Sequence, residues 1–260
     1  MSRPDTCRTA SPTIHGPEMG GRDPTGKPFV RRGAWYTALQ FTDSVTQSRM
    51  YTWWPDRLQV GYTRTMFAAL LVQPRPRRIG IFGLGGGSQA KFCHRYLRDS
   101  HIEVCERNAD VLALRDVFHI PPDSGRFTVI CADAARLVRQ RRECYDLILL
   151  DAYDVFGIPP SLSTQAFYDA CREALSPAGI LAMNLYSTNA RRHIARLRKS
   201  FEGRMQVLDE PHDGNRVVFA WREQARAHDT AAVFAGWPWS TRRQIAPSIR
   251  RFAGSLERRP

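Results

Sequence analysis

The glycine-rich stretch "GLGGGSQAKF", residues 83–92, is the strongest indication of the fold in this sequence. It follows directly after the apolar run IGIF at residues 79–82, which has the length and composition of a buried strand. Glycine allows positive φ and a close approach of the backbone to a ligand, so the stretch is typical of a tight turn between a strand and a helix. The same turn can also serve helix packing alone. Its neighbours along the chain therefore have to indicate its role.

The region after residue 78 alternates between short apolar runs and amphipathic stretches. The apolar runs predict strands at 79–82, 102–106, 127–131, 146–150 and 180–184. The amphipathic stretches predict helices at 88–98, 109–117, 134–140, 163–174 and 188–201. Strands that alternate with helices pair in parallel and carry helices on both faces. The predicted fold class is α/β, with a doubly wound, mostly parallel sheet.

Composition divides the chain into four segments. Residues 1–32 are rich in Pro, Gly, Ser, Thr and Arg and predict a flexible leader. Residues 33–76 hold two β-prone aromatic runs around a turn and then a helical pattern, which predict a small N-terminal β-hairpin and helix region. Residues 77–222 form the predicted main domain, which closes with two strands around an Asp-Gly turn. Residues 223–260 are interpreted as a basic C-terminal tail.

The charge of the chain bears on its partners. The formal net charge is +13 and the sequence pI is near 10.1, which a nucleic-acid-binding protein would also show. Lysine occurs only at Lys27, Lys91 and Lys199, and arginine is spread along the chain as well as clustered at 191–199 and near the C-terminus. Such spreading is typical of a solvated basic surface, and net charge alone informs weakly about partners. The sequence therefore disfavours a nucleic-acid partner.

Membrane and metal signals are also missing from the sequence. No apolar stretch approaches the roughly 18 residues that suggest a membrane helix, and the N-terminal segment lacks the apolar core of a signal peptide. We therefore expect a cytoplasmic protein with no membrane partner. The six cysteines form no CxxC pair, and no histidine stands at zinc-ligand spacing, so no metal site is predicted.

Candidate binding residues follow four consecutive predicted strands. In a doubly wound sheet, ligands bind outside the carboxyl ends of the strands. These positions hold Gly83, Gly85, Gly86 and Gly87 after the first strand, Glu106 at the end of the second, Asp133 after the third, and Asp151 to Asp154 after the fourth. Each acid also has a structural alternative as a solvated strand end or a helix or turn cap. Their joint placement favours a nucleoside site.

The absence of a phosphate-binding motif narrows the class of ligand. The chain has no GxxxxGK[ST] loop, so no nucleoside triphosphate is indicated. Glu106 stands about 20 residues after the glycine turn, the spacing at which an acid meets ribose hydroxyls. An adenine nucleoside without phosphate, such as an S-adenosyl sulfonium compound, fits better than a dinucleotide, which is the weaker alternative.

From residue 77 to residue 185 the chain resembles the catalytic domain of the spermidine synthase family of polyamine aminopropyltransferases. The resemblance rests on "RRIGIFGLGGGSQAKF", "IEVCERNADV" and "VICADAARLV", and above all on the D-x-x-D at 151–154 followed by "SLSTQAFYDACREALSPAGIL". The upstream "LQFTDSVTQS" and "GYTR" also resemble segments of that family. The resemblance implies a Rossmann-like fold, decarboxylated S-adenosylmethionine as co-substrate, a small amine such as putrescine as acceptor, and a dimer or tetramer. We therefore expect a homodimer.

The resemblance also implies roles for individual residues. Asp151 matches the catalytic acid, and Asp154 the second acid that holds the amine. Glu106 matches the acid at the ribose, and Asp133 with Ala134 matches the Asp-Gly at the adenine. The further candidates for substrate binding are Gln47, Tyr62 and Tyr153.

Several positions depart from the family pattern. The family has an aspartate where this chain has Gly86, and by resemblance that acid contacts the aminopropyl end of the donor and disfavours a carboxylate there. The His and Glu that follow the family's tyrosine are Thr63 and Arg64 here, and a later Pro is Ile158. The nucleoside site is therefore better supported than the amine pocket.

Three functions follow from these observations. The first is transfer of an aminopropyl group to a small amine. The second, motivated by Gly86, is an S-adenosylmethionine-dependent small-molecule methyltransferase. The third is a catalytically degenerate nucleoside-binding or RNA-associated protein, motivated by the altered positions and the net charge.

Overall fold

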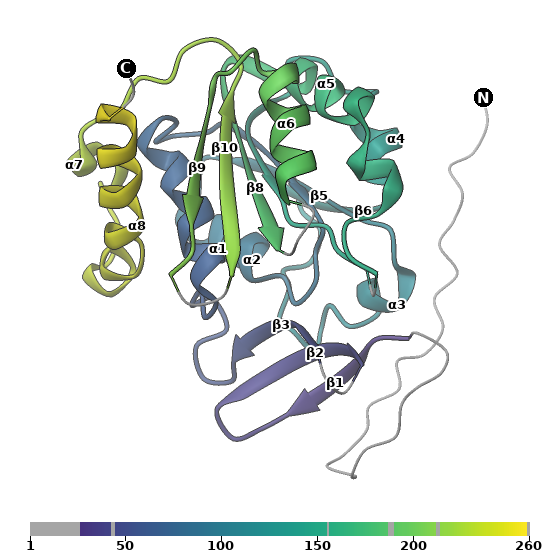
Figure 1. The fold of residues 1–260 in the computed structure, drawn as a ribbon. Helices are drawn as coiled ribbons and strands as arrows, with labels where there is room; N and C mark the ends of the chain where they lie inside the picture. The colour runs from purple at the N-terminus through teal and green to yellow at the C-terminus, as the bar shows by residue number, and fades with distance from the viewer. Residues whose placement is uncertain (1–26, 43–44, 155, 187–189, 212–213, 259–260) are drawn as a thin grey trace.

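The computed structural model describes residues 27–42, 45–154, 156–186, 190–211 and 214–258. Within these residues the chain forms a seven-stranded sheet covered by helices and a three-stranded sheet beside it (Figure 1). No helix among them is long and apolar enough to span a bilayer.

The strands of the large sheet follow the order β6-β5-β4-β7-β8-β10-β9. They are β4 (Arg78–Phe82), β5 (His101–Glu106), β6 (Phe127–Cys131), β7 (Tyr145–Leu150), β8 (Leu175–Tyr186), β9 (Met205–Asp209) and β10 (Asn215–Trp221). From β6 through β8 all neighbours are parallel, while β10 pairs antiparallel with both β8 and β9. The predicted α/β fold and the positions of its strands are confirmed.

The strand order reverses beside β4. The chain continues from β4 to β5 and β6 on one side, and later returns to place β7 on the other side. The crevice at the carboxyl ends of β4 and β7 is therefore a topological switch point, where ligands of doubly wound sheets bind.

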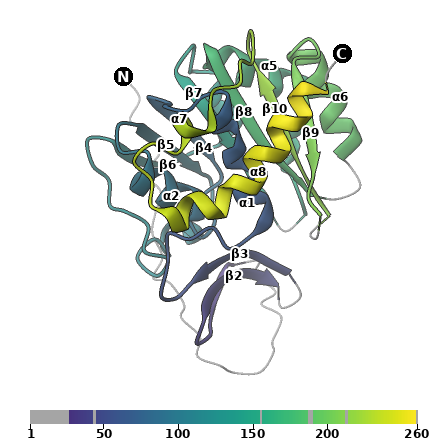
Figure 2. The same cartoon turned by 90° about the vertical axis from the view of Figure 1, so that its left-hand side faces the viewer.

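Helices cover both faces of the large sheet (Figures 1 and 2). One core packs the sheet against α1 (Gly61–Met66), the 3-10 helix η1 (Phe67–Leu71), α2 (Ser88–Tyr96), α3 (Ala109–Leu112), α7 (Thr230–Val233) and α8 (Trp239–Glu257). The other packs it against α4 (Ala134–Val138), η2 (Pro160–Ser163), α5 (Gln165–Ala174) and α6 (Ala190–Ser200). Along β7, Leu147 and Leu149 enter the first core and Ile148 and Leu150 the second, as the two-residue period of a strand requires.

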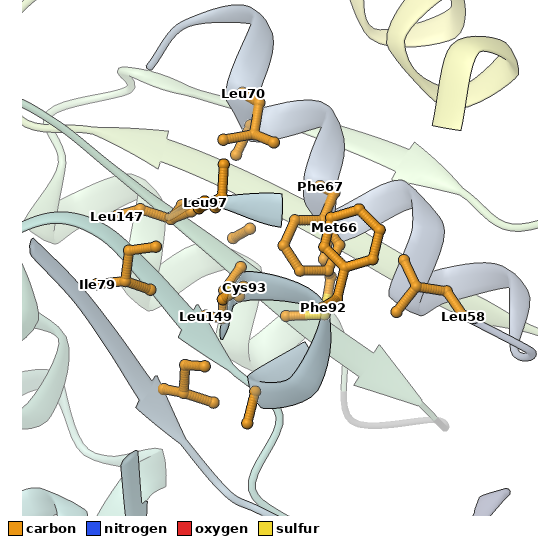
Figure 3. Packing of buried hydrophobic residues seen from close by; sticks show 14 of the residues in the cluster. Leu58, Met66, Phe67, Leu70, Ile79, Phe92, Cys93, Leu97, Leu147 and Leu149 are labelled. Carbon is orange, nitrogen blue, oxygen red and sulfur yellow. The ribbon is translucent and has the colours of Figure 1, made fainter. Parts of the chain in front are cut away.

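The centre of the first core joins α2 to η1. The rings of Phe67 and Phe92 lie 4.3 Å apart between centroids, and both side chains are fully buried (Figure 3). Met66 and Cys93 fill the space beside them (Figure 3). This packing fixes the helix that follows the glycine turn, because burying an aromatic side chain contributes about 1.5–3 kcal/mol.

The small sheet consists of β1 (Phe29–Arg32), β2 (Tyr36–Thr42) and β3 (Val45–Tyr51), paired antiparallel in that order. Val30, Leu39 and Met50 bury their side chains in the first core, which attaches this sheet to the main domain. Because β1 pairs with β2, ordered structure begins before residue 33, and the boundary predicted for the flexible leader is wrong there. The rest of the predicted leader, residues 1–26, lies outside the described residues.

The C-terminal segment is also different from the prediction. In place of a basic tail, the structure has α8, whose Ile245, Ile249 and Phe252 are fully buried. Phe252 stacks on Phe219 of β10 with ring centroids 4.1 Å apart. The helix lies against η1 and α1 (Figure 2). Its apolar positions recur at helical spacing among the arginines, so it is a packed amphipathic helix.

Two predicted helices are shorter than expected. The helical pattern at the end of the 33–76 region, which starts at residue 56, contains α1 and η1, and α1 begins only at Gly61. The pattern over 109–117 contains α3, which ends at Leu112 and continues as turns, with the Leu114 N–H donating to the Val111 carbonyl at 3.1 Å.

Candidate active site

The glycine turn passes close to the end of β7. Gly83 has a φ of +98°, and a Cβ atom placed on it would lie 2.2 Å from the carbonyl oxygen of Asp151. Its N–H donates to the Cys105 carbonyl at 2.9 Å. A side chain at this position is therefore excluded twice, by backbone conformation and by space, and the glycine brings β4 and Asp151 together.

Gly86 and Gly87 face different neighbours from those of Gly83. Gly87 caps α2 in the left-handed conformation, and a Cβ atom there would lie 2.5 Å from Ile120. A Cβ atom at Gly86 would lie 2.8 Å from the Ser48 hydroxyl and 3.1 Å from the Phe118 ring. These two glycines therefore serve the packing of the turn against β3 and the segment after α3.

A cavity of about 970 Å³ opens at the carboxyl ends of the parallel strands and beneath the small sheet. Its lining includes all the predicted site residues except Gly86 and Gly87: Gln47, Tyr62, Gly83, Gly85, Glu106, Asp133, Ala134, Asp151, Tyr153 and Asp154. The volume is in the range of small-molecule sites. Gln47 and Asp154, which are 107 positions apart in sequence, thus line the same cavity.

Glu106 is held by two backbone groups. Its Oε2 accepts the Leu84 N–H at 3.0 Å, and its Oε1 accepts the Asn108 N–H at 2.8 Å. These bonds fix the carboxylate between the glycine turn and the start of α3. Each carboxylate oxygen has a second acceptor position, which a vicinal diol can use.

Asp133 is the N-cap of α4, and a helix cap is the structural role that the sequence offered as the alternative to ligand binding. Its Oδ1 accepts the N–H groups of Ala135 and Arg136 at 2.8 and 3.1 Å. Its Oδ2 accepts the Ser161 hydroxyl at 3.3 Å. Capping does not remove Asp133 from the cavity, which it lines together with Ser161.

Asp151 is held by side chains from three elements, α1, α2 and β8. Its Oδ1 accepts the Asn184 amide at 3.0 Å and its Oδ2 accepts the Gln89 amide at 3.2 Å. Desolvation raises the pKa of Asp151, while hydrogen bonds from Asn184 and Tyr62 lower it, and the net shift is upward. A carboxylate with a raised pKa at a fixed position is a good proton acceptor.

Residues that the sequence analysis missed complete this network. Asn184 on β8 is buried, and its amide oxygen accepts the amide of buried Asn215 on β10 at 2.8 Å. Gln89 comes from α2 and is also buried. No local pattern marks these amides, because each lies inside an otherwise ordinary strand or helix.

Tyr153 and Asp154 follow Asp151 along the chain. The Tyr153 hydroxyl donates to the Asn184 carbonyl at 3.1 Å and accepts the Tyr186 N–H at 2.7 Å, and burial raises its pKa. Asp154 accepts the N–H of exposed Phe156 at 2.9 Å. Tyr153 therefore ties the segment after β7 to the end of β8, and Asp154 lines the cavity beside it.

Tyr62 and Gln47 also line a second cavity of about 890 Å³. Ser48, Thr46 and Val60 belong to both linings. The two cavities thus share a wall formed by β3 and the start of α1. Among the residues that the structure describes, no three His, Cys, Asp or Glu side chains group as a metal ion would need.

Comparison with known proteins gives close relatives but no matching family model. A polyamine aminopropyltransferase of Chromobacterium violaceum is 35% identical over 189 residues, which cover 72% of each chain. One of Neisseria meningitidis is 34% identical over 193 residues, which cover 73% of each chain.

Solved structures share the fold. A probable spermidine synthase from Corynebacterium glutamicum matches 88% of this chain and 91% of its own with a TM-score of 0.68 at 17% identity. A spermidine synthase in complex with the transition state analogue AdoDATO matches 85% of this chain and 89% of its own with a TM-score of 0.60 at 15% identity. Human methyltransferase-like protein 13 in complex with SAH matches 74% of this chain and 93% of its own with a TM-score of 0.59 at 23% identity. At these identities the matches support the fold only.

Proposed function

The chain belongs to the polyamine aminopropyltransferase family, and we propose that it transfers an aminopropyl group from decarboxylated S-adenosylmethionine to an amine. The observation that carries the proposal is the position of Asp151. Its carboxylate lines the cavity at the switch point of the sheet, held by Asn184, Gln89 and Tyr62.

The donor occupies the half of the cavity next to the glycine turn. Glu106 accepts hydrogen bonds from the two ribose hydroxyls, since Leu84 and Asn108 fix its carboxylate toward the cavity. Asp133 and Ala134 lie at the adenine, with Ser161 beside them. The backbone of Gly83 and Gly85 lets the sulfonium approach the turn.

The transfer needs a neutral amine. An aliphatic amine has a pKa near 10 and is an ammonium ion at neutral pH, so a proton has to leave before or during attack. The amine nitrogen attacks the aminopropyl carbon bound to sulfur, the carbon–sulfur bond breaks, and its electron pair stays on sulfur. Methylthioadenosine is the second product, and the proton passes from nitrogen to Asp151.

The groups around Asp151 position it for this step. Asn184 and Gln89 each hold one carboxylate oxygen, so the base cannot rotate away from the nitrogen. Tyr62, Gln47 and Asp154 line the route by which the amine reaches it, and we assign them to substrate binding.

Formation of methylthioadenosine tests the proposed aminopropyl transfer. The protein is incubated with decarboxylated S-adenosylmethionine and a panel of amines, and methylthioadenosine is measured. We expect product that depends on both substrates and is lost in Asp151→Asn. No product with any amine, from a folded protein that binds methylthioadenosine, would refute the proposal and leave the degenerate binding protein.

A methyltransferase is the second candidate, because no carboxylate stands at Gly86 to repel that of S-adenosylmethionine. Calorimetry with both sulfonium donors separates the two functions. Tighter binding of the decarboxylated donor supports aminopropyl transfer, and methyl transfer from S-adenosylmethionine to an acceptor overturns it.

We further propose that the protein is a homodimer in the cytoplasm. Trp35 between β1 and β2, and Trp53 and Trp54 after β3, are at least half exposed, and large exposed aromatic side chains are typical of interfaces. Light scattering measures the mass, and a monomer at micromolar concentration would contradict the dimer.

A further inference from the structure

We propose that the second cavity is a separate binding site for a ligand that carries several phosphate groups. Side chains of β3, of residues 57–65 and of α8 form most of its lining. Its volume of about 890 Å³ is in the range of small-molecule sites. The site goes beyond the proposed aminopropyl transfer and does not depend on it.

The lining of the second cavity is basic. Five of its residues are arginines, namely Arg49, Arg57, Arg64, Arg243 and Arg251. Among the described residues of the lining, Glu210 is the one acid. Its side chain is 5% exposed and pairs with Arg251 at 3.2 Å, so these two charges compensate each other. A net positive charge remains, and it favours an anionic ligand over a cationic amine.

The remaining arginines are available to a ligand. Across the described part of the chain, four arginines of the lining form no ion pair: Arg49, Arg57, Arg64 and Arg243. Arg243 lies over the Trp239 ring at 5.1 Å, and Arg49 lies over the Tyr36 ring at 5.0 Å. Stacking orients the plane of a guanidinium and leaves its N–H groups to form paired hydrogen bonds with phosphate oxygens.

A buried pair of hydroxyl groups also lines the cavity. Thr65 on α1 and Ser248 on α8 are 1% and 7% exposed, and their hydroxyl oxygens lie 3.0 Å apart. The two hydroxyl groups carry two hydrogens, and the bond between them uses one. Within the described ranges neither hydroxyl has another hydrogen-bond partner. One buried donor is therefore left for an acceptor atom in the cavity, such as a ligand oxygen.

Several phosphate groups fit this lining better than a single carboxylate does. A carboxylate brings one negative charge and pairs with one guanidinium at a time. A triphosphate brings several charges and many acceptor oxygens, which arginines from β3, α1 and α8 can share with the Ser248 hydroxyl. An inorganic polyphosphate and the triphosphate of a nucleotide share this chemistry.

Calorimetry of the full chain with inorganic triphosphate, ATP and adenosine tests the site at physiological ionic strength. All titrations contain saturating methylthioadenosine, so that the proposed nucleoside site is occupied. We expect triphosphate and ATP to bind with one site per chain. An affinity for ATP at least about tenfold higher identifies a nucleotide as the ligand, and an equal or lower one identifies a polyphosphate.

Three results of these titrations would contradict the proposal. The first is no binding of either phosphate compound at millimolar concentration. The second is an affinity for adenosine as high as that for ATP, because the phosphates would then contribute nothing. The third is competition between triphosphate and methylthioadenosine, because it would place the anion in the first cavity. Aminopropyl transfer is measured separately, so its failure leaves this test unaffected.

Charge-reversal variants locate the site. Arg64→Glu and Arg243→Glu should each weaken triphosphate binding at least about tenfold, because each replaces attraction by repulsion. Arg243 is exposed, so its substitution does not disturb the core if Arg64→Glu fails to fold. Arg250→Glu is the matched control, since Arg250 is exposed on α8 and does not line the cavity. An equal loss in Arg250→Glu would mean that binding follows net charge alone, which would refute the site.

The hydroxyl pair has its own matched variants. Ser248→Ala should weaken triphosphate binding about threefold or more, because a hydrogen-bond donor is lost. Ser255→Ala should leave the affinity unchanged: Ser255 is also buried on α8, but its hydroxyl donates to the Phe252 carbonyl at 2.7 Å and does not line the cavity. Tighter binding of single-stranded RNA than of triphosphate, weakened equally by Arg64→Glu and Arg250→Glu, would assign the arginines to nucleic acid and overturn the proposal.

Discussion

The side-chain amide of Asn184 donates to Oδ1 of Asp151 at 3.0 Å, and this bond joins the middle of the sheet to the proposed base. The bond favours the ionised carboxylate and lowers the pKa of Asp151 against the opposing effect of desolvation. Asn215 holds the Asn184 amide in turn at 2.8 Å, so the orientation of the base is set from β8 and β10.

Asn184→Ala should therefore shift the pH dependence of turnover. Without the amide the pKa of Asp151 rises further, so the acidic limb of the kcat profile should move to higher pH. We expect kcat to fall about 10–100-fold at pH 7, with KM changed little. Asn215→Ala is the control, since it leaves the direct donor in place and should have a smaller effect. An unshifted acidic limb in Asn184→Ala would contradict the role assigned to this bond.

Asp151→Asn should abolish transfer and keep the nucleoside site. The variant loses the proton acceptor, which contributes typically 10²–10⁴-fold to a rate. Glu106 is untouched and methylthioadenosine carries no charge, so it should bind with an affinity within about threefold of the original. Single-turnover kinetics measures the loss of transfer, and calorimetry measures the retained binding of methylthioadenosine. Retained turnover would remove Asp151 as the base.

The same substitution should stabilise the fold at neutral pH. Because burial raises the pKa of Asp151 in the folded state, its contribution to stability is present below the ordinary value of 3.8 and is lost as pH rises through the folded pKa. Asp151→Asn should therefore have a higher Tm than the original protein at pH 7, with the difference vanishing below pH 3.8. Asp99→Asn, the same change at an exposed site, should show no such trend.

Glu106→Gln should weaken nucleoside binding. The variant replaces a carboxylate that can accept from the backbone and from both ribose hydroxyls by an amide with one acceptor oxygen. We expect the Kd for methylthioadenosine to rise about 10–100-fold, as the loss of charged hydrogen bonds costs about 1.5–3 kcal/mol. Glu223→Gln at an exposed position is the control. An unchanged Kd would place the ribose elsewhere.

Gly83→Ala should destabilise the protein strongly. Its φ of +98° and the 2.2 Å approach of the new Cβ to the Asp151 carbonyl force the backbone to move. We expect the free energy of unfolding to fall by roughly 2–4 kcal/mol. Gly125→Ala, where a Cβ would meet no atom within 4 Å, should change it by less than about 0.5 kcal/mol. Equal losses of unfolding free energy in Gly83→Ala and Gly125→Ala, measured by chemical denaturation, would show that the close approach at Gly83 does not restrict the side chain there.

The parallel sheet and the line of acids along its edge can be predicted from the amino-acid sequence. Both follow from local features: the apolar runs, the glycine turn, and the rule that parallel strands bring their carboxyl ends to one edge. Glu106, Asp133 and Asp151 could be singled out because each stands at the end of a strand or within two residues of it. The side-chain partners of Asp151 could not be predicted in this way, because Gln89 and Asn184 reach it from elements remote in sequence, and Asn215 in turn holds Asn184.

Other features depend on tertiary contacts that local composition does not reveal. Residues 29–32 belong to a sheet because β2 offers them a partner strand, and the arginine-rich C-terminus is a helix because Ile245, Ile249 and Phe252 find an apolar face to cover. The second cavity likewise forms only in the folded chain, where Arg49, Arg64 and Arg243 come together from β3, α1 and α8. Periodicity fixes which face of each element is apolar, whereas the packing of those faces decides which polar side chains meet.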